Sequence, residues 1–83
     1  MADDRSLTVI RAAVAEAAAG RAVTDETPLI QERILDSLSL LGLVARLEQE
    51  LGVVVHDADI LPDNFGSIRQ IHTFVSTRSL RAS

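Results

Sequence analysis

Residues 36–51 of this chain, DSLSLLGLVARLEQEL, decide the fold. Their large aliphatic side chains recur at spacings of three and four residues, the period of an α-helix that buries one side. The stripe expected to face the core consists of Leu40, Leu43, Val44, Leu47 and Leu51. We therefore predict a helix from Asp36 to Leu51, ended by Gly52, because glycine is common just after helix C-termini.

The same stretch carries a second apolar row beside that stripe. Leu38, Leu41 and Ala45 share one side of the predicted helix, because residues three and four apart are neighbours on a helix surface. A helix needs an apolar stripe of about 100° to cover one core, and this helix has more than that. We therefore expect part of the second row to stay exposed to solvent.

Apolar periodicity also predicts a long helix near the N-terminus. Leu7, Ile10 and Val14 recur at helical spacing, and the alanines that follow add strong helix propensity. The predicted helix runs from about Ser6 to Ala19, with Asp3, Asp4 and Ser6 as candidate caps and Gly20 as its stop.

The connection at residues 21–35 combines turn chemistry with apolar side chains. Pro28 biases the residue before it away from the helical region. The aliphatic residues that follow are too apolar for a solvated loop. We expect four of them to pack into the fold: Leu29, Ile30, Ile34 and Leu35.

The remainder of the chain predicts one short and one long helical segment. Residues 53–55 are β-branched but have no partner strand, so we expect extended chain there. Residues 57–61 are expected to form one helical turn, which the following proline stops. Ser67, followed three residues later by Gln70, matches a capping box and predicts a last helix to about Thr77.

Three long amphipathic helices and one short helix predict an all-α fold, a small antiparallel four-helix bundle. Eighty-three residues leave room for one domain, residues 1–83, with a folded core of about residues 5–77. The expected core consists of Ile10, Val14, Leu43, Val44, Leu47, Leu51, Ile68, Ile71 and Phe74.

The composition argues against several classes of function. A net charge of −4 disfavours binding to nucleic acid, and the absence of Trp and Tyr removes the rings on which bases stack. Without cysteine there is no thiolate site, and His56 and His72 lie too far apart for a helical metal pair, so we expect no metal site. No apolar run is long enough to span a membrane and the first residues do not resemble a signal peptide, so we expect a cytoplasmic location.

One residue has the features of a covalent attachment site. Ser37 follows Asp36 at a helix start, where backbone N–H groups and the helix dipole favour a phosphate. It also follows a long connection, so it should be exposed, and no base lies near enough in sequence to activate it as a nucleophile. Ser37 therefore suits carrying a phosphodiester, although Asp-Ser is by itself also a common N-cap pair.

From Asp36 onwards the sequence resembles the acyl carrier protein family, in which Asp-Ser-Leu precedes a helix of spaced aliphatic residues. Residues 59–68 are similar to the short third helix and fourth-helix entry of stand-alone carriers of secondary metabolism and of D-alanyl carrier proteins. The resemblance covers about residues 5–77. Arg33 and Ile34 stand where the family often has Gly, and Gly42 stands where fatty-acid-synthase carriers usually have Glu.

The resemblance implies a carrier without catalysis of its own. Ser37 would receive 4′-phosphopantetheine from coenzyme A through a Mg²⁺-dependent phosphopantetheinyl transferase. The thiol of that arm would hold an acyl group as a thioester, in a chain that has no cysteine of its own. Asp36 would help to orient the metal ion of the transferase. The residues that face the transferase and other partners would be Asp36, Leu38, Leu41, Ala45 and Glu48.

The expected partners are the transferase, an acyl- or aminoacyl-loading ligase, and a downstream synthase or transferase of fatty-acid, polyketide or other secondary-metabolite biosynthesis. The carrier itself is expected to be a monomer. An alternative is an aminoacyl or D-alanyl-type carrier loaded by an adenylating ligase. A second alternative is an unmodified helical docking module, which would use Leu38 and Leu41 as anchors and would not need Ser37.

Overall fold

The computed structural model describes residues 2–82, with the side chains of residues 5–78. These residues form three long helices and two short elements: α1 (Ala2–Ala17), α2 (Ser37–Leu51), the 3₁₀ turn η1 (Asp57–Asp59), α3 (Pro62–Phe65) and α4 (Ile68–Ala82). Over this range the chain contains no strand. The predicted all-α bundle of three long helices and one short helix is therefore confirmed.

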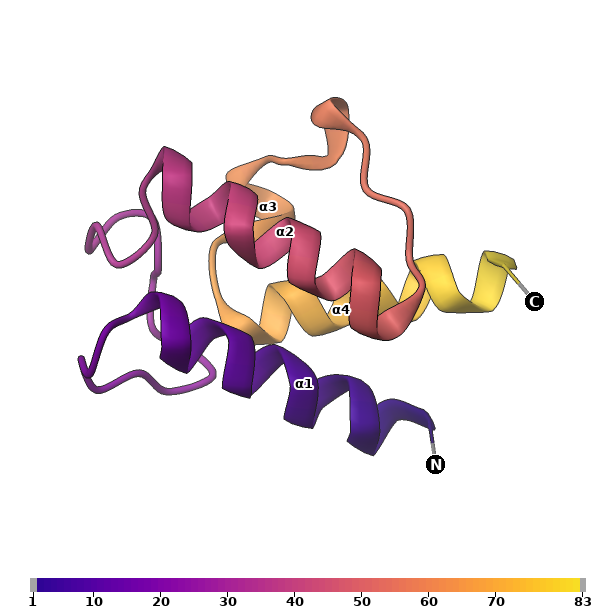
Figure 1. Ribbon diagram of the computed structural model, residues 1–83, viewed down its shortest axis with the longest axis horizontal. Helices are drawn as coiled ribbons and strands as arrows, with labels where there is room; N and C mark the ends of the chain where they lie inside the picture. The colour runs from indigo at the N-terminus through magenta and orange to yellow at the C-terminus, as the bar shows by residue number, and fades with distance from the viewer. Residues whose placement is uncertain (1, 83) are drawn as a thin grey trace.

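The long helices are arranged around α1, which packs against both α2 and α4, while α3 packs against α4. Figure 1 shows α1 and α2 running in opposite directions, and α4 running in the same general direction as α2. This arrangement is possible because the segment between α2 and α4, which includes α3, carries the chain back toward the end at which α2 begins.

The start of α1 differs from the prediction. The helix begins at Ala2, so Asp3, Asp4 and Ser6 lie inside it and none of them is its N-cap.

The end of α1 also comes earlier than predicted, at Ala17. The chain leaves the helix because Ala19 and Gly20 adopt positive φ angles of 53° and 91°. Gly20 reaches this left-handed region without the steric cost that Ala19 incurs. Gly20 therefore has the left-handed conformation expected of a residue that follows a helix, but α1 ends at Ala17 and not at Ala19 as predicted.

Both ends of α2 carry the residues that the sequence indicates. Asp36 is the N-cap, and its Oδ1 accepts a 2.8 Å hydrogen bond from the Ser39 N–H. The helix itself therefore begins one residue later than predicted. At the other end Gly52 adopts the left-handed conformation, with φ of 69°, and its N–H donates to the Glu48 carbonyl.

Between α2 and α4 the predicted extended chain and the predicted helical turn are both present, and a further short helix follows them. Residues 53–55 are extended, and residues 57–59 form a 3₁₀ turn. The short helix α3 lies within residues 59–68, the stretch that resembles the short third helix of the family, and Pro62 begins this helix instead of stopping the turn before it. Proline is favourable at a first helical position, because its φ is already helical and the missing N–H would have no partner there.

The last helix begins as predicted and continues past its predicted end. The Gln70 N–H donates to Ser67 Oγ at 3.2 Å, as a capping box requires. The helix continues to Ala82 instead of ending near Thr77. No glycine or proline follows Thr77 that would end it earlier.

The core contains all of the predicted residues except Leu51, which is only partly buried. The first connection contributes Leu29, Ile34 and Leu35, while Ile30 is only partly buried. Beyond the prediction, Phe65 of α3 is fully buried, and its ring lies 5.4 Å from that of Phe74 on α4, measured between centroids. These two phenylalanines join the short helix to α4.

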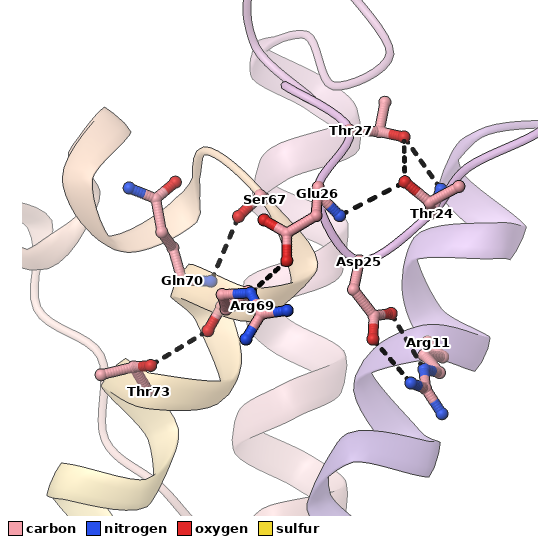
Figure 2. Close-up of polar contacts among 9 residues, drawn as sticks. All are labelled: Arg11, Thr24, Asp25, Glu26, Thr27, Ser67, Arg69, Gln70 and Thr73. Carbon is pink, nitrogen blue, oxygen red and sulfur yellow. Dashed lines mark hydrogen bonds and ion pairs between the residues drawn. The ribbon is translucent and has the colours of Figure 1, made fainter.

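The first connection is fastened to both α1 and α4, as Figure 2 shows. The Asp25 carboxylate forms an ion pair with Arg11 of α1 at 2.6 Å, and these hydrogen bonds lower the pKa of the Asp25 carboxyl. The Asp25 carbonyl accepts from the Arg69 N–H in the first turn of α4 at 3.1 Å. Glu26 forms an ion pair with the Arg69 side chain. The segment that leads to α2 is therefore held against the bundle.

Candidate functional site

Ser37 is the first residue of α2, and its side chain is exposed. Directly before it, the Asp36 carboxylate is held by the N–H of Ser39. That hydrogen bond lowers the pKa of the Asp36 carboxyl, so the group is ionised at neutral pH. The site thus offers an exposed hydroxyl beside a fixed negative charge, at the positive end of a helix dipole.

The two serines at the start of α2 differ in their surroundings. Successive residues of a helix are about 100° apart, so Ser39 points roughly 200° away from Ser37. Ser39 lines a small hollow of about 230 Å³ between α1 and α2, together with Ala13, Gly42 and Arg46. A protein that approaches Ser37 therefore does not meet Ser39 on the same side.

The segment before Ser37 is anchored by buried side chains. Ile34 and Leu35 are only 6% and 4% exposed, and their N–H groups donate to the Leu29 carbonyl at 2.9 and 3.1 Å. Arg33 makes the turn that precedes them with a positive φ of 59°. Glycine adopts that conformation without strain. The buried residues that precede Asp36 therefore fix the position of Ser37.

The residues expected to face a partner fall into two groups. Leu38 and Leu41 are 82% and 58% exposed, and Ala45 is also exposed. Glu48 is partly buried, and its Oε2 accepts a 3.0 Å hydrogen bond from the Val55 N–H. Glu48 therefore helps to hold the extended chain after α2, a role that no sequence pattern predicts.

Arg46 of α2 also forms ion pairs that the sequence analysis does not predict. The Arg46 guanidinium donates to Glu50 at 2.6 Å and to Glu16 of α1 at 2.9 Å. The spacing of four residues between Arg46 and Glu50 is a recognisable helical pair, so this half could have been predicted. Glu16 lies thirty residues away, and only the packing of α1 on α2 brings it near.

The rest of the described chain offers no competing site with metal-binding chemistry. Within it, no three His, Asp or Glu side chains gather to hold a metal ion. None of its helices combines the length and apolar character needed to cross a bilayer. A hollow of about 420 Å³ lies on α3 and α4 around the 2.5 Å ion pair of Arg78 and Asp59, and no residue of α2 lines it.

Comparison with known proteins identifies the family. A family described as "phosphopantetheine attachment site" matches residues 8–75, which includes all of α2 and α3 and most of α1. No curated protein matches the sequence. Proteins of this family are carrier domains that hold 4′-phosphopantetheine covalently on a serine. The exposed hydroxyl at the start of α2 is compatible with such an attachment. The chain therefore belongs to the phosphopantetheine-attachment family of carrier domains.

Proposed function

We propose that this chain is an acyl carrier protein whose Ser37 bears the 4′-phosphopantetheine arm. An acyl group is held as a thioester on the arm and is presented to the enzymes of a biosynthetic pathway. The observation that supports this proposal is the exposed Ser37 hydroxyl at the start of α2, directly after the capping carboxylate of Asp36.

Attachment forms a bond between Ser37 Oγ and the phosphorus next to pantetheine in coenzyme A. The bond to the neighbouring phosphate breaks, adenosine 3′,5′-bisphosphate leaves, and the hydroxyl proton passes to a base of the transferase. The chain contributes a phosphate-favouring helix N-terminus and the Asp36 carboxylate, which would help to orient the metal ion of the transferase. The arm supplies the thiol, which a chain without cysteine cannot supply itself.

The same proposal covers location and partners. The carrier works as a cytoplasmic monomer with no catalysis of its own. Its partners are a phosphopantetheinyl transferase, a ligase that loads the acyl group and a downstream synthase. Charge is consistent with protein partners and not with nucleic acid, because a net charge of −4 would repel a phosphate backbone.

The absence of cysteine permits a direct test. The protein is incubated with coenzyme A, Mg²⁺ and a broad-specificity phosphopantetheinyl transferase, and its intact mass and thiol content are measured after removal of small molecules. Every thiol on the protein then belongs to an arm, because the unmodified chain has none. We expect one arm on the wild type, one on Ser39→Ala and none on Ser37→Ala.

Two results would overturn the proposal. An arm that remains on Ser37→Ala and disappears from Ser39→Ala would place the attachment at the other serine. A wild-type protein that gains no thiol with several transferases would favour an unmodified docking module. Circular dichroism of each variant shows whether a negative result comes from lost folding.

A further inference from the structure

Arg33 occupies a position in its turn that normally belongs to glycine. Its φ of 59° lies in the left-handed region. The Arg33 N–H donates to the Ile30 carbonyl at 3.1 Å, and the Ile34 N–H donates to the Leu29 carbonyl at 2.9 Å. Glycine is the usual residue after such a turn, because any larger side chain adds steric strain in this conformation. The turn itself therefore gains nothing from an arginine.

The guanidinium of Arg33 is not engaged by the rest of the fold. The side chain is exposed, and it forms no hydrogen bond or ion pair with the residues whose side chains the structure describes. Within that range only one other arginine, Arg5 of α1, is in the same condition. The remaining arginines there bind a carboxylate or a carbonyl: Arg11, Arg21, Arg46, Arg69 and Arg78. The positive charge of Arg33 is therefore free to bind a group outside the fold.

The position of Arg33 relative to Ser37 is fixed by the chain between them. Ile34 and Leu35 are buried, and both of their N–H groups donate to the Leu29 carbonyl. Four residues span at most about 14 Å when fully extended, and a chain whose successive amides share one acceptor spans less. Ser37 therefore lies close enough for a side chain as long as that of arginine to approach it.

An arm on Ser37 would add a negative charge next to an existing one. A phosphodiester is an anion at neutral pH, and the Asp36 carboxyl is ionised there, because its hydrogen bond to a backbone N–H lowers its pKa. The N-terminus of α2 supplies only about half of one positive charge. Arg46, the next arginine along the chain, is already held by two carboxylates. Arg33 is therefore the cation available to balance the second charge.

We propose, on the basis of the function proposed above, that the Arg33 guanidinium binds the phosphodiester of the arm attached to Ser37. Arginine suits this group, because its planar N–H donors can bind two phosphate oxygens at once. The contact would hold the phosphate end of the arm at the start of α2 and leave the thiol end free to move. Because both groups are exposed, the ion pair should be weak and sensitive to salt.

The experiment compares the wild type, Arg33→Gln and the matched control Arg5→Gln, each before and after the arm is attached. Intact mass confirms that each protein carries one arm on Ser37. Glutamine removes the charge without changing the backbone requirement, since it also has a Cβ. Arg5 is exposed like Arg33, but the start of α1 and the start of α2 lie at opposite ends of the molecule (Figure 1). Both substitutions therefore remove one free positive charge, and only one of them does so near Ser37.

The first measurement is the shift in melting temperature caused by the arm. At about 0.02 M NaCl, this shift should be about 2–4 °C less favourable in Arg33→Gln than in the wild type, as loss of one exposed ion pair in a small domain predicts. Arg5→Gln should match the wild type within about 1 °C. In about 0.5 M NaCl, the difference between Arg33→Gln and the wild type should disappear.

The second measurement observes the guanidinium directly. In ¹H–¹⁵N spectra, the Arg33 Nε–H signal is assigned by its absence from Arg33→Gln, and the Arg5 signal by its absence from Arg5→Gln. Attachment of the arm to the wild type should shift the Arg33 signal and leave the Arg5 signal in place.

Other results would overturn the inference in distinguishable ways. If the wild type takes up no arm at Ser37, the proposed function fails and this inference fails with it. If the arm is attached but its effect on the melting temperature is the same in Arg33→Gln and the wild type, only the contact with Arg33 is overturned. Equal losses in Arg33→Gln and Arg5→Gln would reflect net charge alone and would also overturn it. An unchanged melting temperature together with a tenfold lower kcat/KM for arm transfer to Arg33→Gln would assign Arg33 to the transferase instead of the arm.

Discussion

The two sides of α2 are built from the same kind of residue and have opposite environments. Toward the bundle, Leu43 and Leu47 are 3% and 0% exposed, whereas Leu38 and Leu41, on the side of α2 that we call the outward face, are 82% and 58% exposed. Aliphatic composition therefore does not locate a core by itself. The inward residues are buried because α1 and the anchored first connection pack around them, while the described residues place nothing over the outward face.

The same contrast between filled and open space appears at two glycines. A Cβ added to Gly66, between α3 and α4, would lie 2.5 Å from the Pro62 carbonyl oxygen. A Cβ added to Gly42, in the middle of α2, would meet no atom within 4 Å apart from its own helix backbone and chain neighbours. Glycine is therefore required sterically at Gly66 and is only tolerated at Gly42.

The inward face predicts the largest effect. Leu47→Ala should cost about 2–5 kcal/mol, because Leu47 is fully buried and its loss leaves a cavity among α1, α2 and α4. Small domains have only about 5–15 kcal/mol of stability, so much of the protein would unfold. Urea denaturation followed by circular dichroism measures the change. A midpoint equal to the wild type would place Leu47 outside the core and invert the comparison.

Gly66→Ala should destabilise the domain by about 1–3 kcal/mol, because the added methyl group overpacks the site. Because the Pro62 oxygen belongs to the backbone, the α3–α4 junction must shift to make room. The shift would also disturb the 2.7 Å bond from the Leu29 N–H to the Gly66 carbonyl. Thermal melting measures the loss, and an unchanged melting temperature would show that the junction is looser than its contacts indicate.

Gly42→Ala should have the opposite sign and stabilise the domain by about 1 kcal/mol. Alanine is the better residue in a helix interior by that amount, and the added methyl group enters open space. Thermal melting measures this gain as well, and Gly66→Ala, which should change the melting temperature in the opposite direction, is the matched comparison. Destabilisation by Gly42→Ala would mean that the hollow between α1 and α2 is closed in solution.

Features of this molecule that depend on residues close together in the sequence could be predicted more fully than contacts between residues far apart in the sequence. The limits of α2, its Asp36 cap and the position of Ser37 follow from residues that are neighbours in sequence, so they could be predicted. The four-residue α3 is too short to show a helical period. The hydrogen bond from the Arg69 N–H to the Asp25 carbonyl joins residues that are far apart in the sequence and meet only in the fold, so no sequence pattern predicts it.

Asp36 should have a smaller effect that depends on pH. The hydrogen bond from the Ser39 N–H lowers the pKa of this carboxyl in the folded protein. Its contribution to stability is therefore complete above the unfolded value of about 3.9 and is lost as the pH falls through the lower folded value. Asp36→Ala should lower the melting temperature by a few degrees at pH 7, and the gap should narrow near pH 3. A gap that is the same at both values would mean that the cap acts without its charge.

The smallest expected effect on stability is at Leu41, and it tests the comparison most directly. Leu41→Ala removes the same atoms as Leu47→Ala, from the same helix, only six positions away. Because Leu41 is 58% exposed, the change should shift stability by no more than about 0.5 kcal/mol. Alanine also has slightly the higher helix propensity, which offsets part of any lost contact. Urea denaturation of both variants in one buffer gives the difference between the two faces. A Leu41→Ala protein as unstable as Leu47→Ala would show that the outward face is covered in solution, and its leucine would then be a core residue and not a free anchor beside Ser37.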